Sequence, residues 1–249
     1  MNGNMPTNMI DHIFCCDCLE GMKQIPDGTI DAVICDLPYG TTKNSWDSVI
    51  PFDELWKEYR RITKPTAPII LFGAEPFSTA VRMSNIKEYR YDWIWEKDNS
   101  VGFLHANKRP LRIFENICVF YKNQPTYNPQ GLRYNPKVQR RGSTGNNYHS
   151  AKSNEYVTEY ENYPTDILFF SKDADDWHPT QKPVDLLRYL VLTYTNEGDT
   201  VLDNCSGSGT TAVACVKEKR HFICFEKDET YWKKSVERVK NEQRQLTLF

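Results

Sequence analysis

Long apolar runs are missing from this sequence of 249 residues. A membrane-spanning helix needs roughly 18 consecutive apolar residues, and no segment approaches that length. The opening segment MNGNMPTNMIDH also lacks the basic flank and the apolar stretch of a signal peptide. We therefore expect a cytoplasmic protein with no membrane partner. Hydrophobic residues at 39% and charged residues at 26% are ordinary for a folded domain, which excludes an intrinsically disordered chain.

An excess of one charge and a zinc-binding cysteine pattern are also absent. The formal net charge is -2, so only a local cluster of charge could attract a nucleic acid. Of the eight cysteines, Cys15, Cys16 and Cys18 lie close together, but no second pair or histidine cluster follows at a zinc-like spacing. We therefore expect reduced, mostly buried cysteines and no metal site.

Short apolar runs alternate with amphipathic stretches along the chain, which predicts strands joined by helices. The expected strands are 12–16, 30–36, 68–72, 91–96, 116–121, 200–203 and 221–225. The expected helices are 53–62, 76–84, one beginning at Pro183, a small-residue helix after the glycines near 209, and one from about Asp228. This pattern predicts an α/β fold, with a central, mostly parallel twisted sheet, helices on both faces, and ligands at the carboxyl ends of the strands.

One stretch interrupts this alternation. Residues 122–152 are rich in Pro, Asn, Gln and Gly, show little periodicity, and contain six Lys or Arg but no Asp or Glu. A long segment without regular structure inside a compact domain is usually functional or disordered. The segment is therefore either a basic binding loop or a solvated loop without acids.

The expected strand 200–203 runs into the glycine-rich segment DNCSGSGTTA, residues 203–212. Glycines there would let a ligand approach the backbone, and a following helix would offer free N–H groups. Gly207, Gly209 and Ala212 fit a dinucleotide-binding pattern, with Glu226 placed 19 residues after Gly207 as a ribose-binding acid. A nicotinamide enzyme is thus one alternative, although a conventional dinucleotide fold would need several further strands after this point.

A second motif, Asp36-Leu37-Pro38-Tyr39, ends the expected strand 30–36. It would bring a carboxylate, a turn-forming proline and an aromatic ring to the carboxyl edge of the sheet, where open α/β sheets hold their reactive groups. The alternative is a strand that ends in a turn, with the tyrosine packed in the core.

The two motifs together resemble the amino-methylating DNA methyltransferases that use S-adenosylmethionine, over nearly the whole chain. The family's catalytic tetrapeptide is usually Asp-Pro-Pro-Tyr, and here it precedes the glycine loop, the circularly permuted order of the beta group. The hexapeptide HPTQKP at 178–183 is similar to that group's motif before the loop. Departures are Leu37 for the first proline, Asn204 and Cys205 for Pro-Phe, and Phe114 where relatives often carry a His-Glu pair.

The resemblance implies a site-specific DNA methyltransferase that acts on the N6 amine of a flipped-out adenine. The Asp36 carboxylate and the Leu37 carbonyl would accept the amine hydrogens, Pro38 would complete the turn, and Tyr39 would stack on the base. Adenine is favoured because Asp heads the motif, whereas cytosine-N4 enzymes more often begin it with Ser. Cytosine N4 is the nearest alternative; an oxidoreductase and an inactive DNA-binding module are more remote.

The cofactor residues implied by the resemblance come from several parts of the chain. Thr180 and Lys182 would reach the methionine carboxylate, Asp203 the amino group, Glu226 the ribose, and Asp17 the adenine amine. The full predicted set is Asp17, Thr180, Lys182, Asp203, Asn204, Cys205, Gly207, Ser208, Gly209, Thr210 and Glu226.

Double-stranded DNA is the expected partner. We assign 122–164 to an inserted target-recognition loop within a single domain, 1–249, with Lys97 and Arg112 extending the same face. The predicted DNA-contacting residues are Lys108, Arg109, Arg133, Lys137, Arg140 and Arg141. A cognate restriction endonuclease, a homodimer, a bacterial or phage origin and association with the nucleoid are further expectations.

Overall fold

The computed structural model describes residues 9–41, 47–140, 155–174, 177–178 and 180–246. The chain divides into two compact units, Met1–Asn128 with Asp166–Phe249, and Pro129–Thr165. The larger unit holds the predicted α/β fold. The smaller one overlaps the predicted target-recognition segment 122–164 and ends one residue after it. Each unit is described by itself.

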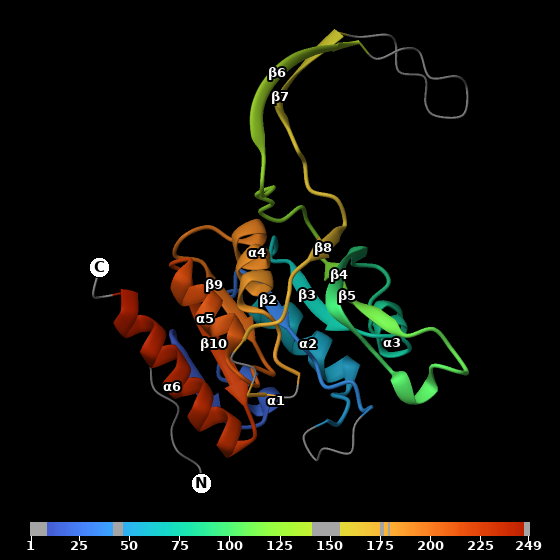
Figure 1. Cartoon of the computed structure of the whole chain (residues 1–249). Helices are drawn as coiled ribbons and strands as arrows, with labels where there is room; N and C mark the ends of the chain where they lie inside the picture. Colours follow the sequence, from blue (N-terminus) through green and yellow to red (C-terminus); the bar gives the residue numbers. More distant parts are fainter. Residues whose placement is uncertain (1–8, 42–46, 141–154, 175–176, 179, 247–249) are drawn as a thin grey trace. The chain divides into compact units, whose positions relative to one another are not determined.

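A sheet of eight strands forms the centre of the larger unit in the described chain (Figure 1). Its order is β1-β10-β9-β2-β3-β5-β4-β8. The strands are β1 His12–Cys15, β2 Ala32–Cys35, β3 Ile69–Gly73, β4 Tyr89–Val101, β5 Arg112–Phe120, β8 Ile167–Phe169, β9 Thr200–Asp203 and β10 His221–Glu226. Neighbouring strands are parallel except β3 with β5 and β4 with β5. The prediction of a mostly parallel sheet is confirmed.

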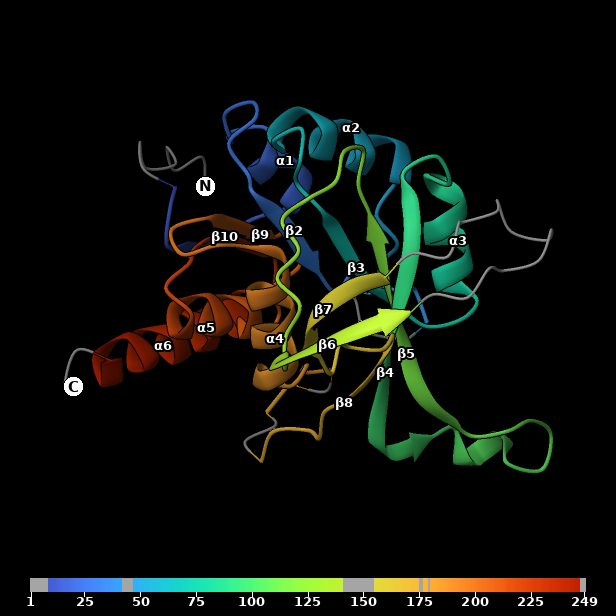
Figure 2. The ribbon, with the colours of Figure 1, turned by 90° about the horizontal axis from the view of Figure 1, so that it is seen from above.

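Helices cover both faces of this sheet (Figure 2). One face carries α1 Cys18–Met22, α2 Phe52–Ile62 and α3 Phe77–Ser84, and the other carries α4 Val184–Tyr194, α5 Thr210–Lys217 and α6 Glu229–Leu246. Side chains of β3 alternate between the two cores: Ile70 and Phe72 pack on the α4–α6 side, Ile69 and Leu71 on the α1–α3 side. Burial on both faces explains why the central strands are continuous apolar runs.

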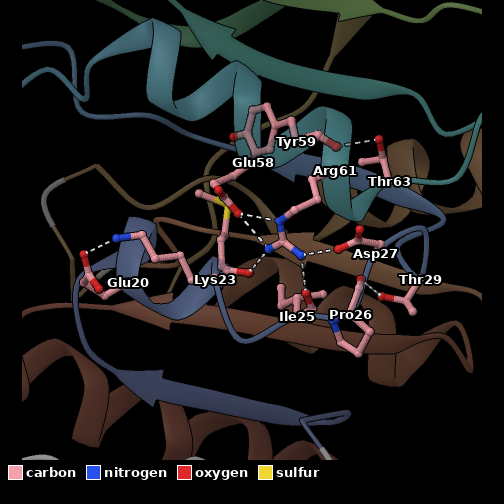
Figure 3. Close-up of polar contacts among 11 residues, drawn as sticks. Glu20, Lys23, Ile25, Pro26, Asp27, Thr29, Glu58, Tyr59, Arg61 and Thr63 are labelled. Atoms are coloured by element: carbon pink, nitrogen blue, oxygen red, sulfur yellow. Dashed lines mark hydrogen bonds and ion pairs between the residues drawn. The ribbon is translucent and has the colours of Figure 1, made fainter.

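Arg61, near the end of α2, joins that helix to the segment after α1 (Figure 3). Its guanidinium donates to the carbonyls of Met22 at 2.7 Å and Ile25 at 2.8 Å, and it pairs with Asp27 and Glu58. A planar guanidinium can satisfy several acceptors in one plane, which suits this role better than a single ammonium. These contacts fix the chain that leads into β2.

The prediction of an irregular loop at 122–152 is wrong for the described residues 133–140, which form a strand. β6 Arg133–Arg140 and β7 Glu155–Glu161 form an antiparallel pair. The apolar side chains of this pair, among them Tyr134, Val138, Tyr156 and Val157, are exposed and do not alternate with polar ones, so the sequence gives no strand signal here. The expected strands 91–96 and 116–121 are also too short, since β4 and β5 extend further into a connection that holds the 3-10 helix η1 Phe103–His105.

Candidate functional site

The two sequence motifs meet at one cavity of about 690 Å³ in the larger unit. β2 and β9 are neighbouring parallel strands, paired at Val33 with Leu202, so their carboxyl ends point to the same edge. Asp36 directly follows β2, and the glycine turn directly follows β9. The cavity is lined by all four residues of the Asp36–Tyr39 motif and, among the predicted cofactor residues, by Asp17, Thr180, Lys182, Asp203, Asn204, Cys205, Gly207, Ser208, Thr210 and Glu226. Its volume is typical of small-molecule sites, about 300 to 1,000 Å³.

Asp36 receives hydrogen bonds on both carboxylate oxygens. The Tyr39 hydroxyl donates to Oδ1 at 2.8 Å, and the Lys182 ammonium donates to Oδ2. Burial raises the pKa of Asp36, whereas the Lys182 charge acts in the opposite direction. The carboxylate is thereby held in one orientation at the cavity wall.

The turn after Asp36 is fixed by Asp47 and by ring stacking. The Asp47 carboxylate accepts the amides of Gly40 at 2.8 Å and Thr41 at 2.9 Å. Gly40 has a positive φ of 67°, which favours glycine, and an added Cβ there would lie 2.9 Å from the side chain of Val49. The Tyr39 ring stacks on Phe77 with centroids 4.8 Å apart. Tyr39 is thus held between Asp36 and Phe77.

The glycine turn is tied to the end of β10. The Glu226 carboxylate accepts the amide of Gly207 at 2.8 Å and that of Asp228 at 2.8 Å. Burial raises the pKa of Glu226, and these two backbone hydrogen bonds oppose the rise. Gly209 precedes α5 with φ of 73°, and an added Cβ would lie 2.9 Å from Cβ of Ser235. Gly209 does not line the cavity, so the structure gives it a role in packing.

Asp203, the last residue of β9, is 4% exposed. It accepts hydrogen bonds from the Thr211 hydroxyl at 2.6 Å and from the Cys205 amide at 3.1 Å. Burial raises the pKa of Asp203 to about 6, although both hydrogen bonds favour the charged form. The amide oxygen of Asn204 accepts a hydrogen bond from the Tyr59 hydroxyl at 2.6 Å, which anchors the turn to α2.

Asp17 and Thr180 approach the cavity from other elements. Asp17 caps α1, because its Oδ1 accepts the amides of Leu19 at 2.9 Å and Glu20 at 3.4 Å. Thr180 is exposed, and its hydroxyl lies 3.3 Å from Nδ1 of His178. The role of each toward a cofactor stays a prediction.

Three charged residues of the cavity wall, Lys97, Glu115 and Lys182, have contacts that the sequence did not predict. Lys97, expected on an outer DNA-binding face, is wrong in that placement: its side chain is 12% exposed and pairs with Glu115. Glu115 also lies 3.4 Å from Lys182, whose ammonium contacts Asp36. Phe114 departs visibly from the family pattern in the sequence, but no sequence signal marked Glu115 beside it. The predicted contact of Lys182 with a cofactor carboxylate stays a prediction.

The predicted DNA-contacting residues are spread over two regions. Lys108 and Arg109 are exposed in the β4–β5 connection, close in sequence to Leu104, which is 96% exposed. Arg133 and Lys137 lie on β6, where Lys137 pairs with Glu161 at 2.9 Å. The backbone of Arg140 ends β6, but its side chain and all of Arg141 lie outside the described residues. Arg112 lines the cavity.

Among the described residues, no group of three or more His, Cys, Asp or Glu side chains could hold a metal ion. Within the same residues, no helix combines the length and the apolar character needed to span a bilayer.

Several methyltransferases resemble this chain in sequence or in fold. The type II methyltransferase M.HpaI of Haemophilus parainfluenzae is 27% identical, over 94% of this chain and 76% of that protein. The DNA adenine methyltransferase YhdJ of Escherichia coli (strain K12) is 27% identical, over 90% of this chain and 80% of its own. The crystal structure of an M1.HpyAVI–SAM complex has a TM-score of 0.61 and 21% identity, over 91% of this chain and 98% of that one, which shows a shared fold.

A family comparison decides between the classes of protein that the sequence left open. The sequence model of the family N6_N4_Mtase, described as DNA methylase, matches residues 30–237. The match covers more than half of the chain, and it confirms the resemblance to N6-adenine and N4-cytosine DNA methyltransferases over that to a nicotinamide oxidoreductase. With Asp36 and the glycine turn at one cavity, the protein belongs to the N6_N4_Mtase family of DNA methylases.

Proposed function

We propose that this protein transfers a methyl group from S-adenosylmethionine to the N6 amine of an adenine flipped out of double-stranded DNA. The observation that carries the proposal is the meeting of Asp36 and the Gly207 turn at the ends of adjacent strands, on one cavity. The names of the relatives support a DNA methyltransferase, and YhdJ supports adenine as the base. The M1.HpyAVI–SAM complex supports the cofactor.

The chemistry of the cavity wall suits S-adenosylmethionine. Asp203 supplies a buried carboxylate for an ammonium group, and Glu226 and Asp17 supply acceptors for hydroxyl and amine hydrogens. The start of α5 at Thr210 presents backbone N–H groups, which favour a carboxylate. When bound there, the cofactor would supply an electrophilic methyl group on a sulfonium.

Asp36 and Leu37 act on the target amine. The adenine amine is a weak nucleophile because its lone pair is delocalised into the ring. Acceptance of its two hydrogens by the Asp36 carboxylate and the Leu37 carbonyl favours the tetrahedral nitrogen of the transition state, a differential stabilisation. Each carboxylate has about four lone-pair sites, so Asp36 can accept from the amine while it keeps Tyr39 and Lys182.

The aromatic side chain of Tyr39 holds the flipped base. One face of its ring stacks on Phe77, and the base would occupy the other face. Stacking contributes about 1 to 3 kcal/mol per base, which offsets the few kcal/mol needed to unstack it. Held in this way, the amine nitrogen would receive the methyl group that the cofactor supplies and would release one proton toward the Asp36 carboxylate, with no covalent link to the enzyme. The protein therefore contributes to catalysis mainly by holding the target amine and the cofactor in a reactive geometry.

DNA would be held by the cations outside the cavity. Lys108 and Arg109 are exposed and suit phosphate contacts, while the basic segment 122–164 is proposed as the target-recognition region. A cognate endonuclease, a homodimer, and a cytoplasmic, nucleoid-associated location with a bacterial or phage origin stay predictions.

Transfer of tritium from labelled S-adenosylmethionine to DNA, followed by mass analysis of the nucleosides, tests this function. We expect N6-methyladenine from the wild type, and no transfer by Asp36→Ala with cofactor affinity nearly unchanged. Asp53→Ala on α2 is the matched control, because Asp53 is an exposed carboxylate outside the cavity wall. Retained transfer by Asp36→Ala would contradict the role of Asp36, and N4-methylcytosine as the product would contradict adenine.

A further inference from the structure

Four charged side chains of alternating sign form a continuous chain in the wall of the cavity. Lys97 of β4 contacts Glu115 of β5, Glu115 lies 3.4 Å from Lys182, and Lys182 contacts Asp36. The exposed fractions of these side chains are 12% for Lys97, 13% for Glu115, 9% for Lys182 and 25% for Asp36. Lys97 and Glu115 lie outside the sequence motifs, whereas Lys182 belongs to the hexapeptide at 178–183.

Lys182 is confined on several sides. Its ammonium has a carboxylate from Asp36 and one from Glu115, and it lies 5.3 Å from the ring centre of Phe72 and 6.0 Å from that of Tyr39. Aromatic rings at such distances attract a cation through cation–π interactions, without hydrogen bonds. Removing one partner from a buried set of this kind leaves an uncompensated charge, so each member depends on the others.

We propose that Glu115 is a positioning residue of the methyl transfer, which holds the Lys182 ammonium against Asp36 while Lys97 neutralises Glu115. Lys182 in turn fixes the orientation and charge of the Asp36 carboxylate. The inference rests on the proposed function. It gives Glu115 and Lys97 a role in positioning Asp36, and it assigns Lys182 to Asp36 in place of the predicted contact with the cofactor carboxylate.

The two carboxylates repel each other, but both favour the charged form of Lys182. Burial raises the pKa of Asp36, Lys182 lowers it, and Glu115 by direct repulsion raises it. Burial would lower the pKa of Lys182, but both carboxylates keep it above its ordinary value. Glu115 is therefore unfavourable to ionised Asp36 directly and favourable only through Lys182.

Other groups near Asp36 do not replace this connection. The Tyr39 hydroxyl donates to Asp36 and lowers its pKa. Asp203 and Cys35, on β9 and β2, carry acidic groups that interact unfavourably with an ionised Asp36. Among the described groups that face Asp36, Lys182 is the cation, and Glu115 is the residue that holds it.

The sign of a pH shift tests the proposal. Glu115→Gln keeps the size of the side chain and removes its charge. We expect kcat to fall about tenfold to a hundredfold through misplacement of Asp36, and the acidic limb of the kcat profile to move to higher pH. If Glu115 were only a nearby negative charge, its removal would move that limb to lower pH, which would overturn the proposal.

A double-mutant cycle and cofactor binding separate the remaining outcomes. We expect Lys182→Met to move the acidic limb of the kcat profile to higher pH as well. The kcat of the double variant, Glu115→Gln with Lys182→Met, should be no lower than that of Lys182→Met alone, because Glu115 acts through Lys182. Calorimetry should give S-adenosylmethionine dissociation constants within about twofold of wild type, which also reports that each variant has folded. A Lys182→Met variant with tenfold weaker cofactor binding and unchanged kcat would place Lys182 on the cofactor instead.

Glu96→Gln is the matched control, because Glu96 is an exposed carboxylate that precedes Lys97 on β4. We expect its kcat, pH profile and cofactor affinity to equal those of the wild type. Failure of the proposed function would give a different result, since the wild type itself would then methylate no adenine.

Discussion

The Glu226 carboxylate accepts a hydrogen bond from the Gly207 amide at 2.8 Å, across 19 residues of sequence. Both residues were assigned to cofactor binding separately, as the ribose acid and as part of the glycine turn. The structure shows that they also hold each other, because β10 and β9 are adjacent and parallel. The acid therefore shapes the turn before it meets any ligand.

Glu226→Ala should weaken cofactor binding by more than the loss of a ribose contact, because the turn loses its acceptor as well. Leaving the Gly207 and Asp228 amides without this partner should lower the free energy of unfolding by about 1 to 3 kcal/mol. Glu226→Gln keeps one acceptor oxygen, so its cofactor affinity and stability should lie between those of the wild type and of Glu226→Ala. Calorimetry with S-adenosylmethionine measures the affinity, and thermal unfolding measures the stability. Glu197→Ala, an exposed acid, is the control; equal effects of the two alanine variants would refute the connection.

Cofactor affinity should fall as the pH drops through the range where Asp203 takes up a proton. The pKa of Asp203 is raised to about 6 by burial, so the free enzyme holds it ionised above that pH and neutral below it. An ammonium group binds the ionised form better, so the dissociation constant should rise by up to about tenfold per pH unit below pH 6. Calorimetry from pH 5 to 8 measures the change.

The control for this pH dependence is Asp203→Asn, which retains an acceptor oxygen but not the titrating charge. Its affinity should be weak and nearly constant over the same range. A wild-type dissociation constant that stays flat, or a full pH dependence in the variant, would assign the effect to another acid, with Glu226 as the next candidate because burial also raises its pKa.

Exchanging Lys108 and Arg109 together for Gln should weaken DNA binding and reduce its dependence on salt. Each phosphate contact contributes about 0.9 to the slope of log affinity against log salt, so the slope should decrease by about 1.8. Fluorescence anisotropy with a DNA duplex at several salt concentrations gives this slope. Lys57→Gln on α2, an exposed cation outside the cavity wall, should leave it unchanged. An unchanged slope in the double variant would remove the β4–β5 connection from the DNA interface.

The strands that bear the two motifs were predictable because they are buried on both faces and appear as apolar runs. β9 and β2 lie close to their expected positions, and the helix from Pro183 matches α4. The hairpin of β6 and β7 was missed because exposed strands such as the one with Tyr134, 71% exposed, carry no apolar alternation. Lys97 was misplaced for a related reason: a lysine in a strand is normally a surface residue, whereas this one is largely buried, paired with Glu115 and close to the Trp95 ring.

By itself, the sequence determined which chemical groups this protein has and on which type of element each lies: a carboxylate after one strand, glycines after another, and a Lys before a helix. Such features are local, because residue type and periodicity over a few positions decide them. Only the tertiary structure decided which groups meet. Lys182 contacts Asp36 across 146 residues because strand order, which local patterns do not encode, brings separate strand ends to one edge. Burial at that edge then makes each charge depend on its partner.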